Sequence, residues 1–176
     1  ELASWLLTQR SDPKQWLHSC WGYHFDWQAR AFYVPAGKPN IITTVYVARA
    51  LHELGTVTAD QSLIDIALEA ARFISKQLYT EADGRDFYAY IPGEQAFVHN
   101  ASLWGAAWCA FAGKQLADDN LVEQALRVAR QSVKEQAVDG SWVYGARHHH
   151  QFIDGFHTGY NLEALCLIRD AAGHGE

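Results

Sequence analysis

Apolar and polar positions follow helical spacing in two segments of the chain, residues 63–77 and 121–135. Leucines, alanines and basic residues recur between them about 58 residues apart, and within each segment apolar residues return every three or four positions. This period predicts an amphipathic helix that buries one face and exposes the other. We therefore expect two related outer helices, with start signals at Thr58 and Asn120.

Three other segments are apolar around most of a helical circumference: residues 41–54, 100–116 and 157–168. A helix that is apolar on all sides is buried on all sides, so we expect these to be inner helices. Gly55 follows the first of them and is predicted to end it. A short helix over residues 2–9 comes before this series, in the position of the last helix of an earlier hairpin.

Aromatic connectors repeat as well, at residues 20–27, 83–90 and 139–145. The last two begin with the turn dipeptide Asp-Gly and continue into β-prone aromatic residues. Alternating two-faced and buried helices with a repeated connector are typical of an all-α fold of tandem αα-hairpins. The fold class that we expect is an α/α toroid or half-toroid, in which outer helices surround inner ones, with an open αα-solenoid as the alternative. We interpret residues 1–176 as a single, partial toroid domain of about three hairpin repeats, a fragment of a longer chain.

The composition narrows the function. Hydrophobic residues make up 49% and charged residues 19%, as in a globular domain and not in a disordered tail. The net charge is −6 and the basic residues are scattered, so we expect no nucleic-acid partner and no membrane. Phosphate-loop, dinucleotide-binding, nucleophile-elbow and HExxH motifs are missing from the sequence, and we expect no cofactor and no metal. Cys20, Cys109 and Cys166 are expected to be reduced and buried, as in a cytoplasmic protein, with the periplasm as an alternative location.

If the inner helices run parallel, their N-terminal ends and the preceding connectors open on one rim. That rim gathers aromatic rings beside carboxylates, amides and imidazoles, which together suit a sugar: rings cover its C–H face and polar groups bond its hydroxyls. Helix N-termini also favour an anionic sugar. The substrate-binding candidates are Trp21, Tyr23, Arg30, Tyr88, His99, Asn100, Trp142, Tyr144, Arg147, Tyr160 and Asn161.

The densest polar cluster is the segment 154–161, where Asp154 and His157 have the chemistry of a general acid and base. Asp154 is about equally suited to cap the following helix, and His157 to be a hydrogen-bonded rim residue. Asp26 in the first connector is either the second carboxylate of glycosidic cleavage or an acceptor for backbone amides of its turn. The catalytic candidates are Asp26, Asp154 and His157. The run of three histidines at 148–150 is not assigned to a metal, because consecutive side chains point apart.

Three stretches carry a family resemblance: residues 20–30, 98–102 and 152–163, the last reading FIDGFHTGYNLE. They resemble the inner-helix starts and connectors of the six-hairpin glycosidase-like α/α toroids, and more narrowly bacterial toroids associated with polysaccharide synthesis or processing. The resemblance implies a site at the inner-helix N-terminal rim and a glycan substrate. It does not fix the reaction, because hydrolases, lyases and epimerases share this shape.

Our leading hypothesis is a glycan-active enzyme, or the C-terminal part of one, that acts on polysaccharide by acid/base chemistry. The rival is a non-catalytic helical-repeat module that binds a protein or glycan partner. Three hairpins make half of a six-hairpin ring and would expose inner-helix surface, so we expect pairing with another copy or with a missing N-terminal half. The sugar hypothesis requires His99 and His157 to lie at the same end of the assembly.

Overall fold

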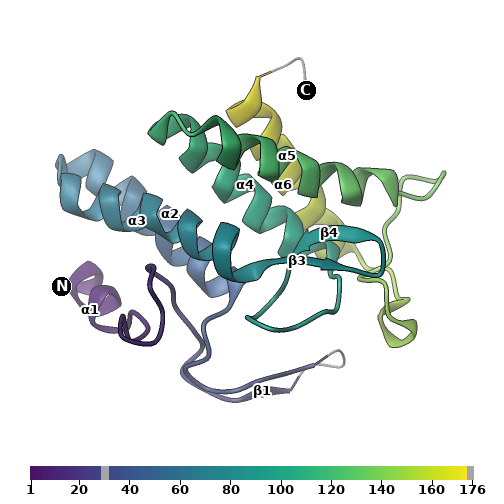
Figure 1. Ribbon diagram of the computed structural model, residues 1–176, viewed down its shortest axis with the longest axis horizontal. Helices are drawn as coiled ribbons and strands as arrows, with labels where there is room; N and C mark the ends of the chain where they lie inside the picture. Colours follow the sequence, from purple (N-terminus) through teal and green to yellow (C-terminus); the bar gives the residue numbers. More distant parts are fainter. Residues whose placement is uncertain (29–31, 174–176) are drawn as a thin grey trace.

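The computed structural model describes residues 1–28 and 32–173 and is built mainly from paired helices (Figure 1). The helices are α1 (Leu2–Thr8), α2 (Ile41–Thr58), α3 (Gln61–Phe73), α4 (His99–Leu116), α5 (Asp119–Lys134) and α6 (Gly155–Ala172). A π-helical turn, η1 (Ile74–Leu78), extends α3, and a 3-10 turn, η2 (His148–His150), precedes α6. Two antiparallel ribbons complete the fold, β1 (Trp27–Gln28) with β2 (Tyr33–Val34) and β3 (Tyr79–Ala82) with β4 (Arg85–Tyr88).

The helices pack as the repeat predicts. Helix α2 forms a hairpin with α3, α4 forms one with α5, and α4 also packs against α2 and α6. Helix α4 is buried along almost its whole length, whereas α3 and α5 bury one face each. The prediction of tandem αα-hairpins in an all-α, toroid-like arrangement is confirmed.

The turn that joins the inner helix to the outer helix, which we call the corner, is built in the same way in both hairpins. Its position along the chain differs from our prediction. Gly55 does not end α2, which continues to Thr58. A Cβ at Gly55 would come within 2.8 Å of the Ile64 side chain, so this glycine lets α3 approach α2 closely. Gly113, 58 residues later, holds the matching position: a Cβ there would lie 2.6 Å from Val122.

The helix caps were also predicted two residues away from their true positions. Asp60 and Asp118, not Thr58 and Asn120, accept the capping hydrogen bonds of α3 and α5. Each aspartate follows an alanine in the left-handed conformation, with φ of 54° and 51°. An alanine here takes the left-handed position after a helix that glycine usually occupies. The prediction relied on glycine to mark the helix end, and it therefore placed the end of α2 too early.

The aromatic connectors hold the starts of the inner helices in place. Thr44 Oγ1 on α2 accepts the backbone N–H of Trp21 at 3.1 Å, and Ser102 Oγ, 58 residues later, accepts that of Tyr88 at 3.2 Å. The first N–H of α2 donates to the Tyr90 carbonyl and that of α4 to the Tyr144 carbonyl. N–H groups in the first turn of a helix have no partner within that helix, so the connectors satisfy them.

Helix α6 departs from the expected pattern. Of its residues, all of which the structure describes, three are buried, Asn161, Ala164 and Ile168. Cys166 was expected to be buried but is exposed, unlike Cys20 and Cys109. Within residues 1–28 and 32–173, the flank of α6 that carries Cys166 is left uncovered. None of the described helices is long and apolar enough to cross a membrane.

Candidate functional site

The three inner helices begin at one shared cavity of about 220 Å³, which we call the mouth cavity. The second residue of each inner helix lies on its wall: Ile42 of α2, Asn100 of α4 and Phe156 of α6. The starts of the three inner helices therefore meet at one cavity, although of these three residues only Asn100 is polar. The lining consists of Tyr23, Trp27, Ile42, Tyr46, Tyr90, Asn100, Trp104, Tyr144, Phe156, His157 and Tyr160.

One aromatic residue from each inner helix meets the others at this cavity. Tyr46, Trp104 and Tyr160 occupy equivalent repeat positions, and the Trp104 ring lies 5.6 Å from that of Tyr46 and 5.7 Å from that of Tyr160. The Tyr46 hydroxyl donates to the Tyr160 hydroxyl at 2.9 Å. Burial is the main cause that raises the pKa of Tyr46, and the hydrogen bond with Tyr160 raises it further. The phenol therefore stays protonated at neutral pH.

The connectors contribute a second group of rings. The hydroxyls of Tyr23 and Tyr90 share a hydrogen bond of 2.8 Å, and the Trp27 ring lies 5.5 Å from that of Tyr90. Burial raises the pKa of Tyr144 to about 12 and also raises the pKa of Tyr23 and of Tyr90. The cavity thus presents neutral hydroxyls and apolar ring faces.

Two buried polar atoms of the lining lack a hydrogen-bond partner within residues 1–28 and 32–173, Asn100 Oδ1 and Trp104 Nε1. One is an acceptor and the other a donor. Such unsatisfied groups are rare in folded proteins and call for an explanation, commonly a water or a ligand.

His157 is the imidazole of the cavity wall, and it is paired with Asp154. His157 Nδ1 lies 2.7 Å from Asp154 Oδ2, while the His157 backbone N–H donates to Asp154 Oδ1, also at 2.7 Å. Burial alone would raise the pKa of the Asp154 carboxyl, but the hydrogen bonds from His157 outweigh it and the pKa is lowered. The ionised carboxylate therefore caps α6 and also orients the imidazole of His157 through Nδ1, so that Nε2 is the ring nitrogen that does not contact Asp154.

Several predicted binding residues lie in the core instead of on the cavity wall. Trp21 is buried and donates its indole N–H to the Leu6 carbonyl, which ties α1 to the body of the protein. Trp142 donates to the Ser132 carbonyl, and the buried Tyr88 donates its hydroxyl to Gln124. The structure gives these three rings packing roles away from the cavity.

His99 starts α4 at the same end of the assembly as His157, as the sugar hypothesis requires, but it is not part of the cavity lining. It is 1% exposed, and its Nδ1 shares a 3.1 Å hydrogen bond with the Ser132 hydroxyl. Burial lowers its pKa to about 4, with Glu135 opposing and Arg85 adding to the shift. His99 is therefore neutral at physiological pH.

The remaining predicted residues are scattered. Asp26 is exposed, and its carboxylate accepts the Ala36 backbone N–H at 2.8 Å, outside the cavity lining. This hydrogen bond lowers the Asp26 pKa. Arg147 pairs with Glu94 at 2.8 Å, and Asn161 is buried outside the lining. Arg30 lies outside the described residues.

The sequence interpretation missed four lining residues, Ile42, Tyr46, Trp104 and Phe156. Tyr46, Trp104 and Tyr160 lie 58 and then 56 residues apart, so a comparison of the repeats could have identified them as equivalent positions. Trp27 and Tyr90 belong to the predicted aromatic rim but were not among the chosen binding residues. Metal ligands are not indicated either: the described residues hold no group of three or more His, Cys, Asp and Glu suited to a metal.

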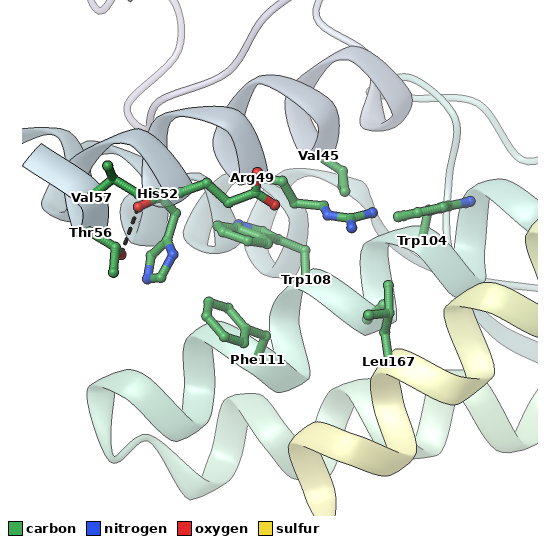
Figure 2. Close-up of a pocket in the computed structure, with 11 residues that line it drawn as sticks. Val45, Arg49, His52, Thr56, Val57, Trp104, Trp108, Phe111 and Leu167 are labelled. Atoms are coloured by element: carbon green, nitrogen blue, oxygen red, sulfur yellow. Dashed lines mark hydrogen bonds between the residues drawn. The ribbon is translucent and has the colours of Figure 1, made fainter.

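A second hollow, which we call the inner groove, runs along the inner helices beyond the mouth cavity and shares Trp104 with it. Its volume is about 550 Å³. Figure 2 shows Trp108 and Phe111 of α4 facing His52 of α2, with Leu167 of α6 closing the far side. The Arg49 guanidinium lies 4.9 Å from the centre of the Trp104 ring.

No family model matches the chain, and no curated protein matches its sequence. Solved structures do match its shape. One is the unsaturated glucuronyl hydrolase of Bacillus sp. GL1, described as responsible for the degradation of glycosaminoglycan, with a TM-score of 0.64 and 16% sequence identity. The match covers 85% of this chain and 44% of that enzyme, so the chain spans less than half of its length. In fold, the chain resembles part of the α/α toroid of that enzyme.

Proposed function

We propose that the chain binds a sugar unit of a glycan in the mouth cavity, as part of a glycan-processing enzyme in which His157, oriented by Asp154, transfers protons. The observation that carries this proposal is the composition of the cavity wall. Aromatic rings from all three inner helices and all three connectors surround a small space with neutral hydroxyls, and two residues of its wall each carry an unsatisfied polar atom.

This wall suits a pyranose better than the other common ligands. A sugar has an apolar C–H face that packs on rings, and hydroxyls that both donate and accept. The cavity is smaller than the roughly 300–1,000 Å³ typical of sites for drug-sized ligands, which favours one sugar unit at the mouth. Phosphate is a poorer fit, because no lysine or arginine lines the described cavity.

The catalytic part of the proposal rests on the His157–Asp154 pair. An imidazole oriented through Nδ1 by a carboxylate is a common arrangement for a general base, and such groups typically contribute about 10²–10⁴-fold to a rate. The fold supports this assignment, since a glycan-degrading hydrolase shares it. We do not assign Asp26 to the reaction, because its hydrogen bond to Ala36 and its exposure suit a turn residue.

Binding can be tested by calorimetric titration with a panel of oligosaccharides, including uronate-containing ones. Phe156 lines the cavity and is 67% exposed, so Phe156→Ala should fold normally. Loss of its ring should weaken binding about fivefold to tenfold, the equivalent of about 1–1.4 kcal/mol. Tyr33→Ala is the control, because Tyr33 is 48% exposed outside the cavity lining. Equal affinities for the wild type and Phe156→Ala would exclude the mouth cavity as the site.

Turnover separates the enzyme from the binding module. His157→Gln should leave glycan affinity within about threefold, yet slow product formation about 100-fold or more. The measurement is chromatography of products from any oligosaccharide that binds. A wild-type protein that binds glycans but converts none of them would refute the catalytic part of the proposal and leave the binding part standing.

A further inference from the structure

An aromatic stack leads outward from the wall of the mouth cavity. The Phe25 ring lies almost parallel to the Tyr23 ring, with their centres 5.3 Å apart and an angle of 11° between their planes. Tyr23 lines the cavity, whereas Phe25 lies outside the lining and is 59% exposed. The stack therefore extends the aromatic surface of the cavity by one ring, and this outer ring is open to a ligand.

The backbone that carries the Phe25 ring is held on both sides. On one side, the Tyr23 carbonyl accepts the Gly37 backbone N–H at 2.7 Å. On the other side, the Asp26 carboxylate accepts the Ala36 backbone N–H at 2.8 Å. A ring on a fixed base loses little conformational freedom when a ligand packs on it, so Phe25 is suited to binding.

The chemistry of this outer ring selects the kind of ligand. Phenylalanine has no hydrogen-bonding group, so it recognises an apolar face, and each pyranose unit of a glycan offers one in its C–H groups. A protein partner is a poorer match for one ring. An aromatic side chain buries about 150–250 Å², whereas a stable protein interface buries about 800 Å² on each partner. The contact with Tyr23 also places the ring next to the cavity for the first sugar unit.

We propose that Phe25 forms a second sugar subsite, which packs against the neighbouring unit of a glycan whose first unit occupies the mouth cavity. This inference rests on the proposed function, because the cavity supplies the first subsite. It narrows the substrate class to chains of at least two sugar units. A disaccharide should therefore bind at least about fivefold more tightly than its monosaccharide, with the Phe25 ring as the source of the difference.

The test is calorimetric titration with a monosaccharide and a disaccharide that share a terminal unit, chosen from the sugars that bind the wild type. Phe25→Ala should leave the monosaccharide affinity unchanged and weaken disaccharide binding about fivefold. Phe25→Tyr keeps the ring and should preserve the wild-type ratio of the two affinities. Phe156→Ala, which removes a ring of the cavity lining itself, should weaken binding of both sugars by a similar factor. Leu17→Ala is the control, since Leu17 is 76% exposed outside the lining.

The three substituted side chains are more than half exposed, so the variants should keep the wild-type circular dichroism spectrum. If Phe25→Ala keeps the wild-type ratio of disaccharide to monosaccharide affinity, the second subsite is refuted, and the exposed ring would then fit a protein partner instead. The mouth cavity stands as the sugar site in that case, provided that Phe156→Ala weakens binding of both sugars. If Phe156→Ala binds both sugars like the wild type, or if the wild type binds no sugar, the proposed function fails and this inference fails with it.

Discussion

The burial of His99 makes a quantitative prediction about acid stability. Its pKa is lowered from 6.5 to about 4 in the folded protein, chiefly by burial. Between these two values the unfolded chain binds a proton that the folded chain does not, so stability falls as the pH is lowered through this window. Each pKa unit corresponds to about 1.4 kcal/mol, so the loss should be about 2 kcal/mol at pH 5 and approach about 3 kcal/mol near pH 4.

The assay is urea unfolding, followed by tryptophan fluorescence at about pH 7 and about pH 5. The variant His99→Asn places an amide near the Ser132 hydroxyl and removes the titrating group. It should be less stable than the wild type at neutral pH, but its stability should change much less between the two pH values. The pKa of Glu135, which faces His99, is lowered from its ordinary value, so its carboxylate stays largely ionised at both assay pH values. If the wild type and His99→Asn lose the same free energy on acidification, His99 is not the buried neutral group described above.

Three other predictions test local physics. Asp154→Asn should keep the α6 cap and lower the free energy of unfolding by less than about 0.5 kcal/mol, whereas Asp154→Ala should cost about 1 kcal/mol; equal losses in urea unfolding would contradict a capping role. Gly113→Ala forces a contact of 2.6 Å with α5 and should destabilise by about 1–3 kcal/mol. The control Gly159→Ala, in open space, should be neutral or stabilising by up to about 1 kcal/mol, and a melting temperature that falls equally in both variants would refute the close-approach argument. Burial raises the pKa of Glu135, but two hydrogen bonds from Arg85 at 2.6 and 3.3 Å help to lower it overall. The ionised Glu135 therefore stabilises the folded protein above about pH 4.3, and this contribution is lost as the pH falls below that value. Glu135→Gln should make the free energy of unfolding depend less on pH in this acid range, and an unchanged pH dependence would contradict the argument.

The sequence predicts the helices well because their burial is periodic. The outer helices and the three inner ones appear where the apolar spacing places them, since one buried face or full burial leaves a clear pattern. The corner was misplaced because two alanines take the left-handed conformation there, and no residue pattern marks such alanines. The exposure of α6 could not be predicted either, because its apolar residues resemble those of α4, and the two helices differ in their packing: α4 contacts α2, α3, α5 and α6, whereas α6 packs mainly against α4.

The candidate site was predicted in kind but only partly in its residues. Connector rings point either into the core or into the cavity, and the sequence does not say which, so Trp21 was chosen although Trp27 lines the cavity. Residues inside the inner helices were overlooked in favour of the connectors. Aligning the repeats would have placed Tyr46 and Trp104 with Tyr160 and thereby found the ring cluster.

The central claim is that the starts of three inner helices form one sugar site. A crystal structure of the chain with an oligosaccharide selected by titration tests this most directly. We expect a sugar ring in the mouth cavity, packed on Trp104 or Tyr160 and hydrogen-bonded to Asn100, with His157 beside it. A bound sugar that contacts none of these residues would contradict the account.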